Sequence, residues 1–465
     1  MPAVALALGS RERQLLPVRM GSSSPIDVVR RSAAPLTGTA RDHEPLLALI
    51  GDARIVLLGE ASHGTHEFYA ERAAITRRLI AERGFDAVVI EGDWPDSQRV
   101  NRHVGGLGDD RTAGDALAGF QRFPTWLWRN REVASFVKWL RGHNHGRDPH
   151  ARIGFYGLDL YSLRTSMAAV IDYLARNDPA AAQRARQRYA CFDQFGTDVR
   201  QYGLLARLGV SPLCTHEVMA MLVDLRRHGA QVAARDPHDG ASAFDAEQNA
   251  RLVKNAEGYY RATVLRGDAS SWNRRDRHMA ETLDELERHL GGRLGRAPKL
   301  VVWAHNSHVG DARATEMGQQ RGELSLGQLV RRRHRRDAVL VGFTTHEGSV
   351  MAASHWDGPH AVMRVPAAPP DSIERLLHAT GIARFLLPLR DSPELQAALQ
   401  APRRQRAIGV IYRPDTELQS HCLQACLPRQ FDAVLHIDVT RAVTPLDAHE
   451  PASAPETPET YPSGV

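Results

Sequence analysis

The sequence is poor in cysteine, and it contains no long apolar run. Its four cysteines, Cys191, Cys214, Cys422 and Cys426, form no CxxC pair. We therefore predict neither a disulfide framework nor a thiolate zinc site, and we expect buried or idle thiols. No apolar stretch approaches the roughly 18 residues that a membrane-spanning helix needs, so we expect no membrane partner.

Lysine is also scarce: the chain has a net charge of +5, but its only lysines are Lys138, Lys254 and Lys299. Such an arginine bias is typical of genomic composition rather than of a basic surface. The one dense basic run, Arg331–Arg336, follows a predicted helix, and the C-terminal end of a helix dipole favours cations. Because no aromatics are interleaved with this run, we expect no nucleic-acid partner.

We expect no secretory leader. The apolar segment Ala3–Gly9 is short and no basic residues precede it, so we expect a cytoplasmic protein. Two catalytic signatures are absent too: no GxSxG nucleophile elbow and no HExxH metal motif occur. The first absence disfavours a serine hydrolase, and the second leaves a metal site without a specific motif.

The chain is long enough to bury a large core, with 465 residues and 43% hydrophobic content. Four apolar runs, at positions 55–60, 85–93, 152–160 and 299–305, each end in ionisable residues. Between the first two runs, Phe68, Arg72, Ile75 and Leu79 fall on one helical face. A strand, a helix and a second strand in about 30 residues predict a parallel βαβ unit.

The same pattern predicts the whole architecture: an α/β fold with a central, largely parallel sheet and helices on both faces. Strand signals disappear from Ser162 to about Leu290, which predicts an inserted helical subdomain that forms a lid over the cleft. Later strands are predicted at 338–343, 350–353, 361–365, 385–389, 407–412 and 433–437. The predicted divisions are a flexible N-terminal arm (1–40), the α/β core (41–161 and 296–446), the insertion (162–295) and a disordered tail (447–465).

Parallel strands expose their carboxyl ends as one crevice, so residues at these ends are the candidate site. The first strand end carries Glu60, His63, His66 and Glu67, with Arg72 on the helix that follows. The other strand ends carry Glu91 and the pair His305 and His308. Flanking polar and aromatic residues are candidates for substrate binding, and besides His66 and Glu67 they are Asp93, Trp94, Asp159, Tyr161 and Asn306.

Three chemistries fit this constellation. The histidines, together with Glu60, Glu67 or Glu91, are reasonable ligands for zinc or manganese, as in a metal-dependent hydrolase or transferase. Alternatively, a histidine acts directly as the general base on water, with carboxylates that set its tautomer. Paired histidines in an apolar cleft would also suffice for a non-catalytic protein that binds haem or another ligand. The residues alone do not separate these readings.

The motifs GEASHGTHEFYAER, VVIEGDWPD, FYGLDLYS and WAHNSHVGD, in this order around a helical insertion, resemble the erythromycin esterase family. The resemblance covers roughly Arg54 to Leu446. It implies a hydrolase without a metal or other cofactor, which cleaves the ester of a small-molecule substrate. Resistance-conferring members of the family hydrolyse macrolide lactones, whereas other relatives carry a label from succinoglycan biosynthesis.

The resemblance also implies a catalytic set, all of which is present here: Glu60, His63, Arg72, Glu91, His305 and His308. In this scheme His63 is the general base that takes a proton from water, and Glu60 or Glu91 orients it. His305 stabilises the oxyanion or protonates the leaving alcohol.

Overall fold

The computed structural model describes residues 24–39, 41–195, 202, 204–205, 213–235, 240–263 and 269–447. Most of the predicted arm (1–40) and all of the predicted tail (447–465) except Asp447 lie outside these residues. The described part of the arm forms a helix and a short strand. The side chain of Ser24 caps helix α1 (Pro25–Ser32), which buries Val28 and Val29. Strand β1 (Ala34–Pro35) then pairs with β8 (Arg384–Pro388), so packing and a cap order this segment.

Nine strands of the described residues form one sheet, in the order β1-β8-β11-β6-β2-β5-β3-β4, with β7 paired to β6. Its remaining members are β2 (Ile55–Leu58), β3 (Ala87–Asp93), β4 (Gly154–Asp159), β5 (Leu300–Trp303), β6 (Ala338–Ala353), β7 (His360–Val365) and β11 (Ala433–Thr440). The six strands from β11 to β4 are mutually parallel. The predicted strands at 55–60, 85–93, 152–160 and 299–305 are therefore confirmed, and their carboxyl ends share one edge.

Helices cover both faces of the sheet, as the sequence predicts. The first part of the core contains α2 (Glu44–Ile50), α3 (His66–Arg83), α4 (Trp94–Val104), α5 (Ala113–Leu117), η1 (Thr125–Leu127), α6 (Arg131–Asn144) and η2 (Pro149–Ala151). The second part contains α13 (Asn306–Val309), η4 (Ala312–Ala314), α14 (Glu316–Arg321), α15 (Leu326–His334), η5 (Arg335–Asp337), α16 (Ile373–His378), α17 (Pro393–Ala398), η6 (Pro414–Thr416), α18 (Glu417–Ser420) and α19 (Leu427–Gln430).

Alternate residues of each strand enter different cores, because successive side chains point to opposite faces of a sheet. Leu57 and Val302 join the core on the face of the insertion. Val56 and Trp303 join the core under α3 and α6. Alternate side chains of these short apolar strands thus pack into two separate hydrophobic cores, so both faces of the sheet are buried.

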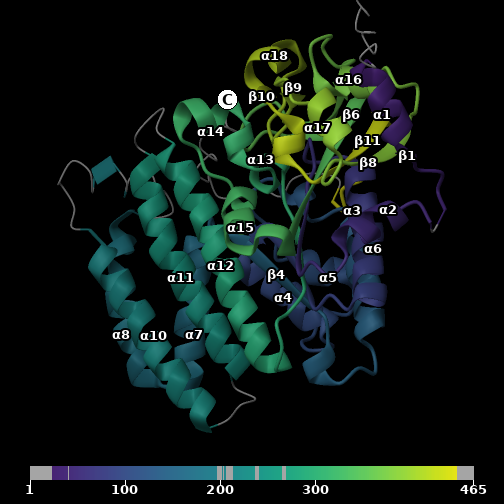
Figure 1. Cartoon of the computed structure of the whole chain (residues 1–465). Helices are drawn as coiled ribbons and strands as arrows, with labels where there is room; N and C mark the ends of the chain where they lie inside the picture. The colour runs from purple at the N-terminus through teal and green to yellow at the C-terminus, as the bar shows by residue number, and fades with distance from the viewer. Residues whose placement is uncertain are drawn as a thin grey trace, which may run out of the picture.

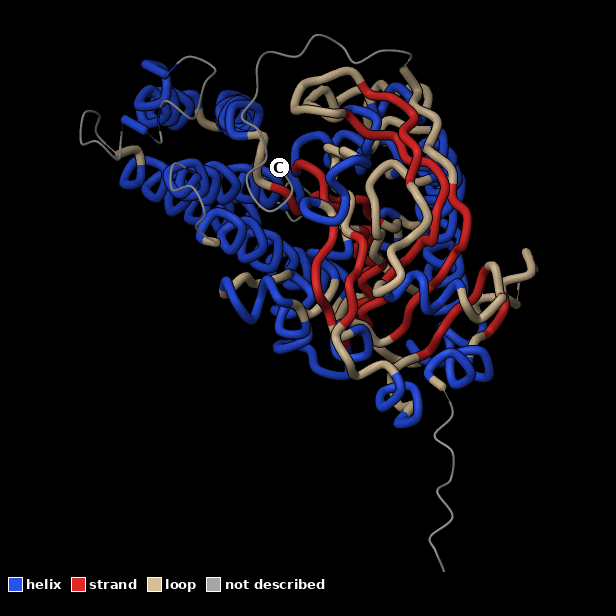
Figure 2. The backbone as a smooth tube through the Cα atoms, turned by 90° about the horizontal axis from the view of Figure 1, so that it is seen from above, coloured by secondary structure: helices blue, strands red, loops and turns tan. Residues whose placement is uncertain are grey.

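The insertion consists of α7 (Leu163–Asn177), α8 (Pro179–Tyr189), η3 (Ala190–Phe195), α10 (Thr215–Arg235), α11 (Gly240–Thr263) and α12 (Ser270–Leu294). Figures 1 and 2 show these helices as a bundle beside the sheet. Helix α11 packs on α7, α10 and α12, and α12 contacts β4. The start of α12 is the part of the predicted lid that lines the active-site cavity.

Two later predictions need correction. The strands expected at 338–343 and 350–353 are one continuous strand, β6, because pairing with β11 and then β7 carries it through Gly348. The strand expected at 407–412 is absent from the described sheet. That segment instead makes isolated bridges, between Ser62 and Ile408 and between Ala353 and Ile411. The neighbouring hairpin is formed by β9 (Arg403–Arg406) and β10 (Cys422–Ala425).

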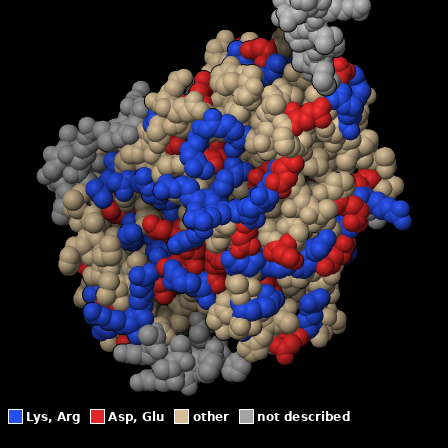
Figure 3. All heavy atoms as spheres, in the orientation of Figure 1, with Lys and Arg blue, Asp and Glu red and all other residues tan. Residues whose placement is uncertain are grey.

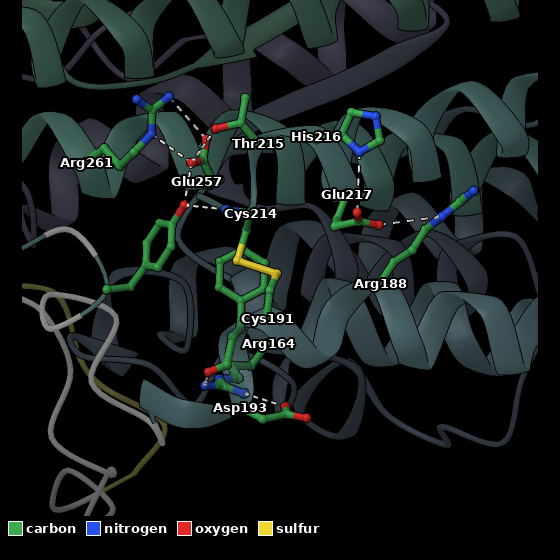
Figure 4. Close-up of a disulfide and its surroundings, with 12 residues drawn as sticks. Arg164, Arg188, Cys191, Asp193, Cys214, Thr215, His216, Glu217, Glu257 and Arg261 are labelled. Atoms are coloured by element: carbon green, nitrogen blue, oxygen red, sulfur yellow. Dashed lines mark hydrogen bonds and ion pairs between the residues drawn. A yellow bond between two sulfur atoms is a disulfide. The ribbon is translucent and has the colours of Figure 1, made fainter. Parts of the chain in front are cut away.

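The cysteine prediction was wrong for one pair. Cys191 at the start of η3 and Cys214 just before α10 form a disulfide, with Cα atoms 5.9 Å apart (Figure 4). Cys422 and Cys426 are free. Sequence spacing did not indicate the pair, because 23 residues separate the two cysteines and only the packing of the insertion brings them together.

Basic side chains gather across the middle of the face drawn in Figure 3, with acidic side chains among them. The basic run at the end of α15 follows this pattern. Arg331 pairs with Asp311 and Asp432, and Arg333 pairs with Asp284 on α12. The described helices include none with the length and apolar character needed to cross a bilayer.

We predict that Gly157→Ala destabilises the fold. A Cβ atom at Gly157 would lie 2.3 Å from the Gly92 carbonyl oxygen and 2.6 Å from that of Asp93, so β3 and β4 would have to separate. The expected loss in the free energy of unfolding is about 3 kcal/mol, measured by urea denaturation. Gly292→Ala in α12 is the matched control, because a Cβ atom there meets no atom within 4 Å. Alanine should stabilise that helix by up to about 1 kcal/mol. Equal effects of the two substitutions would contradict this account of the β3–β4 contact.

Candidate active site

The loop after β2 places His63 at the carboxyl edge of the sheet. Gly64 has φ of 67°, and a Cβ atom there would lie 2.3 Å from the carbonyl oxygen of Met351, so only glycine fits this turn. Segment 407–409 clamps the same loop, since Ile408 donates its N–H to Ala61 and accepts one from His63. The loop is therefore fixed by backbone contacts on both sides.

His63 has a defined tautomer. Its Nδ1 lies 2.8 Å from Oε1 of Glu60, and a carboxylate can only accept, so Nδ1 carries the proton. The basic nitrogen is then Nε2. Glu60 in turn lies 3.0 Å from Nη2 of Arg72, and both side chains are buried. The guanidinium of Arg72 lies 4.3 Å from the ring centroid of Tyr69, which adds a cation–π contact.

Glu91 is held by contacts from two distant segments. Its Oε1 accepts from Nη2 of Arg275 at 2.8 Å, and its Oε2 accepts the backbone N–H of His305 at 2.7 Å. Burial alone would raise the pKa of Glu91, but the positive charges of His308 and Arg275 hold it well below its usual range. Glu91 is therefore an anion that fixes the backbone of the loop after β5.

His308 is a buried cation between two acids. Nδ1 lies 3.0 Å from both oxygens of Asp276, and Nε2 lies 3.1 Å from Nη1 of Arg275 and 3.3 Å from Oε1 of Glu91. Burial alone would lower the pKa of His308, but these carboxylates raise it to about 10. The ring also stacks on Trp272, with centroids 4.4 Å apart. A histidine that stays protonated cannot serve as a general base near neutral pH.

His305 is the opposite case, a neutral imidazole. Burial and the charge of the nearby His63 hold the pKa of His305 well below its usual value. Its Nδ1 accepts the backbone N–H of Ser307 at 3.3 Å, so the proton lies on Nε2. Among the described residues Nε2 has no hydrogen-bond partner. The ring centroid lies 4.8 Å from that of His63, so a donor and a base sit side by side.

Two small cavities meet at this group. One, of about 80 Å³, contacts Trp272, His305, His308 and the segment from Ser420 to Leu423. The other, of about 20 Å³, reaches Asp93, Asp159, Arg122 and the aromatic segment around Phe123. His63, Glu91 and Arg275 line both. The predicted strand ends therefore converge on one site.

The predicted substrate-binding residues are placed in two groups. Asp93 and Asp159 line the smaller cavity, but both are committed to protein contacts. Asp159 forms two hydrogen bonds with Arg275, at 3.0 and 2.7 Å, and Asp93 accepts the N–H of Tyr161 at 2.9 Å. Tyr161 packs below Arg122 and Arg275 and does not line either cavity.

The other four candidates line neither of these two cavities, although Asn306 lines a third, of about 30 Å³, which shares Trp272 and Ser307 with the larger one. Trp94 is buried in the core, where its indole stacks on Tyr156. Asn306 bonds the backbone of Phe343 on β6 through both side-chain atoms. His66 and Glu67 belong to the outer face of α3, where His66 bonds Glu132 and Glu67 bonds Arg441. The structure therefore does not bring these residues to the site, since each has a partner elsewhere.

Sequence reasoning missed the contribution of α12. Arg275 and Asp276 are buried at 3% and 0% exposure, on a helix whose apolar stripe includes Trp272, Met279 and Leu283. Charged residues inside an apolar stripe are a signal that they bind buried partners. The hairpin segment that lines the larger cavity, including His421 and Cys422, was missed as well, and no pattern in the sequence marks it.

The histidines of the site do not form a metal-binding group. Among the described residues, one cluster brings three possible ligand atoms within 4.8 Å of one another, and it consists of Asp284, Glu287 and His334. It lies outside the site, and its acids already pair with Arg333 and Arg54. The Nδ1 atoms of His63 and His308 contact carboxylates, and that of His305 contacts a backbone N–H, so none of the three is free to bind a metal ion.

The site thus combines a carboxylate-oriented histidine, a neutral histidine donor and a buried network of ions at the strand ends of an α/β fold. The model of the family described as erythromycin esterase matches residues 80–440. The chain belongs to the erythromycin esterase family, which supports a hydrolase at the level of the family. The matched residues include Glu91, His305 and His308, whereas Glu60, His63 and Arg72 precede them.

The curated relatives are distant. The chain is 25% identical over 330 residues to erythromycin esterase type II of Escherichia coli, covering 67% of this chain and 73% of that protein. It is 24% identical to erythromycin esterase type I of the same organism, over 76% of this chain and 86% of that one. It is 20% identical to the putative hydrolase YbfO of Bacillus subtilis (strain 168), over 88% and 90%.

Solved structures share the fold. A succinoglycan biosynthesis protein superposes with a TM-score of 0.71 at 21% identity, covering 90% of this chain and 97% of that one. A mutant of the erythromycin esterase EreC in its open conformation superposes with a TM-score of 0.61 at 18% identity, covering 87% and 95%. At these identities the likeness establishes the α/β fold alone.

We predict that His308 stabilises the fold in a pH-dependent way. Because its folded pKa is raised from 6.5 to about 10, its stabilisation is complete below about pH 6.5 and is lost as the pH rises towards 10. His308→Gln should lower the free energy of unfolding by about 3 kcal/mol at pH 6.5, since it removes a buried positive charge that lies between Asp276 and Glu91. The difference from wild type should shrink steadily up to pH 10.

The measurement is urea denaturation of both proteins across that range. His145→Gln is the control, because His145 is exposed at the end of α6 and its replacement should give no pH-dependent difference. A difference for His308→Gln that stays constant from pH 6.5 to 10 would show that His308 is not a buried cation.

Proposed function

We propose that this protein is an ester hydrolase that activates water with His63 and forms no covalent intermediate. The carrying observation is the Glu60–His63 pair directly beside the neutral donor His305, at a cavity they share. Family membership supports hydrolysis as the reaction class. The names of two relatives, erythromycin esterases, support an ester as the bond that is cleaved.

In the proposed reaction, Nε2 of His63 takes a proton from water as the water oxygen attacks the ester carbonyl carbon. Glu60 holds Nδ1–H and stabilises the imidazolium that forms, and Arg72 holds Glu60 in place. General-base assistance of this kind contributes about 10² to 10⁴ in rate. Because Glu60 is the carboxylate bonded to His63, it is the proposed partner of the base, rather than Glu91.

His305 is the proposed donor to the developing oxyanion, because its Nε2–H has no partner among the described residues and its ring is neutral. A preorganised donor in a dry site stabilises the tetrahedral intermediate more than it stabilises the planar ester. When the intermediate collapses, the carbon–oxygen bond to the alcohol breaks, and the proton held by His63 passes to the leaving oxygen. His308 and Glu91 position His305 and do not exchange protons.

A macrolide lactone is the proposed substrate with the most support, and it rests on the relatives' names. The larger cavity, of about 80 Å³, is well below the 300 to 1,000 Å³ typical of ligand pockets. A large lactone would require the start of α12 and the segment around His421 to move apart. A small ester would not require this movement.

The experiment that tests the function is incubation with a panel of macrolides and simple esters, followed by mass spectrometry. Addition of one water to at least one compound is the expected result. Hydrolysis of small esters alone would retain the mechanism and remove the macrolide as substrate. Failure on every ester would count against the proposed reaction.

We predict that His63→Ala loses about 10² to 10⁴ in kcat, because it removes the general base. His63 is buried and bonded to Glu60, so we also expect a loss of about 1 to 3 kcal/mol in the free energy of unfolding, which leaves the protein folded. His145→Ala, an exposed histidine on α6, is the matched control and should retain full activity. Both are compared by steady-state kinetics on whichever ester is cleaved. Near-normal turnover in His63→Ala would refute the mechanism.

We predict that chelation leaves activity unchanged, because the site histidines do not converge on a metal-sized point. The purified protein is assayed for metals by mass spectrometry and then for hydrolysis after dialysis against a chelator. Stoichiometric metal together with activity that is lost on chelation would favour the metal-dependent alternative. A Soret band that shifts on haem addition would favour the non-catalytic alternative.

A further inference from the structure

A second hollow, of about 490 Å³, lies outside the proposed active site on another face of α3. Its floor is made of small side chains: Ala70, Ala73, Ser135 and Ala442. On α3 the lining residues follow spacings of four, three and four, from His66 to Arg77, which places them on one face. The opposite wall is the first turn of α6, and Figure 1 shows α3 and α6 close together in the part of the molecule away from the insertion.

The hollow is lined by an arginine, Arg77, for which no carboxylate partner is found among the described residues. Arg77 makes no ion pair or hydrogen bond among the described residues, and its Nε is buried without a partner. The guanidinium lies over the ring of Trp139, 5.6 Å from the centroid, which fixes its position. Burial with no nearby carboxylate lowers the pKa of Arg77. Arg131 and Arg441 also line the hollow, although Arg441 is already paired with Glu67.

The wall also contains an unsatisfied acceptor. Oε1 of Glu132 bonds Nδ1 of His66 at 2.6 Å, but Oε2 is buried and has no partner among the described residues. The side chain of Glu132 is only 8% exposed, so water does not fully solvate that oxygen. A buried acceptor without a donor costs free energy. The site is therefore complete only when something supplies a donor to Glu132 and an anion to Arg77.

We propose that this hollow binds a small organic anion that also carries hydroxyl groups, such as a phosphorylated sugar. Arg77 and Arg131 bind the anionic group, Arg441 adds positive charge, and Oε2 of Glu132 accepts a hydrogen bond from a hydroxyl. The volume falls within the 300 to 1,000 Å³ of small-molecule sites, whereas the active-site cavity does not. The site is separate from the ester chemistry, because His66 belongs to this hollow and not to the cavity of His63.

Isothermal titration calorimetry with three probes tests the proposal on the full chain. Glucose 6-phosphate carries both features, inorganic phosphate carries the anion alone, and glucose carries the hydroxyls alone. We expect saturable binding of glucose 6-phosphate with Kd below about 1 mM, about fivefold weaker binding of phosphate, and no binding of glucose.

Two variants identify the contacts. Arg77→Met keeps the packing on Trp139 and should weaken glucose 6-phosphate binding by about tenfold or more. Glu132→Gln keeps an oxygen for His66 but loses the free acceptor, so it should abolish the preference for glucose 6-phosphate over phosphate. Arg83→Met is the matched control, because Arg83 is an exposed arginine at the end of the same helix. Equal unfolding midpoints confirm that each variant is folded.

Absence of saturable binding of glucose 6-phosphate up to about 10 mM, far weaker than ordinary specific binding, would overturn the proposal. So would an equal loss in Arg77→Met and Arg83→Met, which would indicate non-specific charge. Equal affinity for phosphate and glucose 6-phosphate would overturn the role of the hydroxyls. None of these results bears on ester hydrolysis, which is assayed with other substrates at another site.

Discussion

The interaction on which the site depends is the binding of one buried guanidinium to two strand-end carboxylates. Arg275 contacts both Glu91 and Asp159, and neither acid is more than 4% exposed. Buried acids at adjacent strand ends would repel each other and would lose their hydration without such a partner. Because Arg275 comes from α12, the same contact joins the inserted helices to the sheet.

The rest of the ion network follows from that contact. Arg275 and His308 offset most of the negative charge of Glu91, Asp159 and Asp276. Glu91 is then free to bind the N–H of His305 and to set the path of the loop after β5. The side chains of the two reactive histidines take their tautomers from other partners. His63 takes its tautomer from Glu60, and His305 takes its tautomer from the backbone of Ser307.

Much of the fold could be predicted, because its signals are local. The four strands with polar ends and the helix from His66 to Arg83 follow from hydrophobic period alone. The residues of the site were harder to separate. His63 and His66, like Glu60, are equally prominent in one short motif. The turn at Gly64, however, directs His63 into the cavity and leaves His66 on the outer face of α3.

The sequence by itself determined that ionisable residues crowd the carboxyl edge of a parallel sheet, because each of them immediately follows a buried strand. Tertiary structure alone decided which of them are partners. Arg275 reaches Glu91 across 184 residues of sequence, and Cys191 reaches Cys214 through the packing of the insertion. Periodicity reports the face on which a side chain lies, whereas pairing over such separations depends on how helices and strands pack. That packing also removed Trp94 from the site, since its indole fills the core against Tyr156.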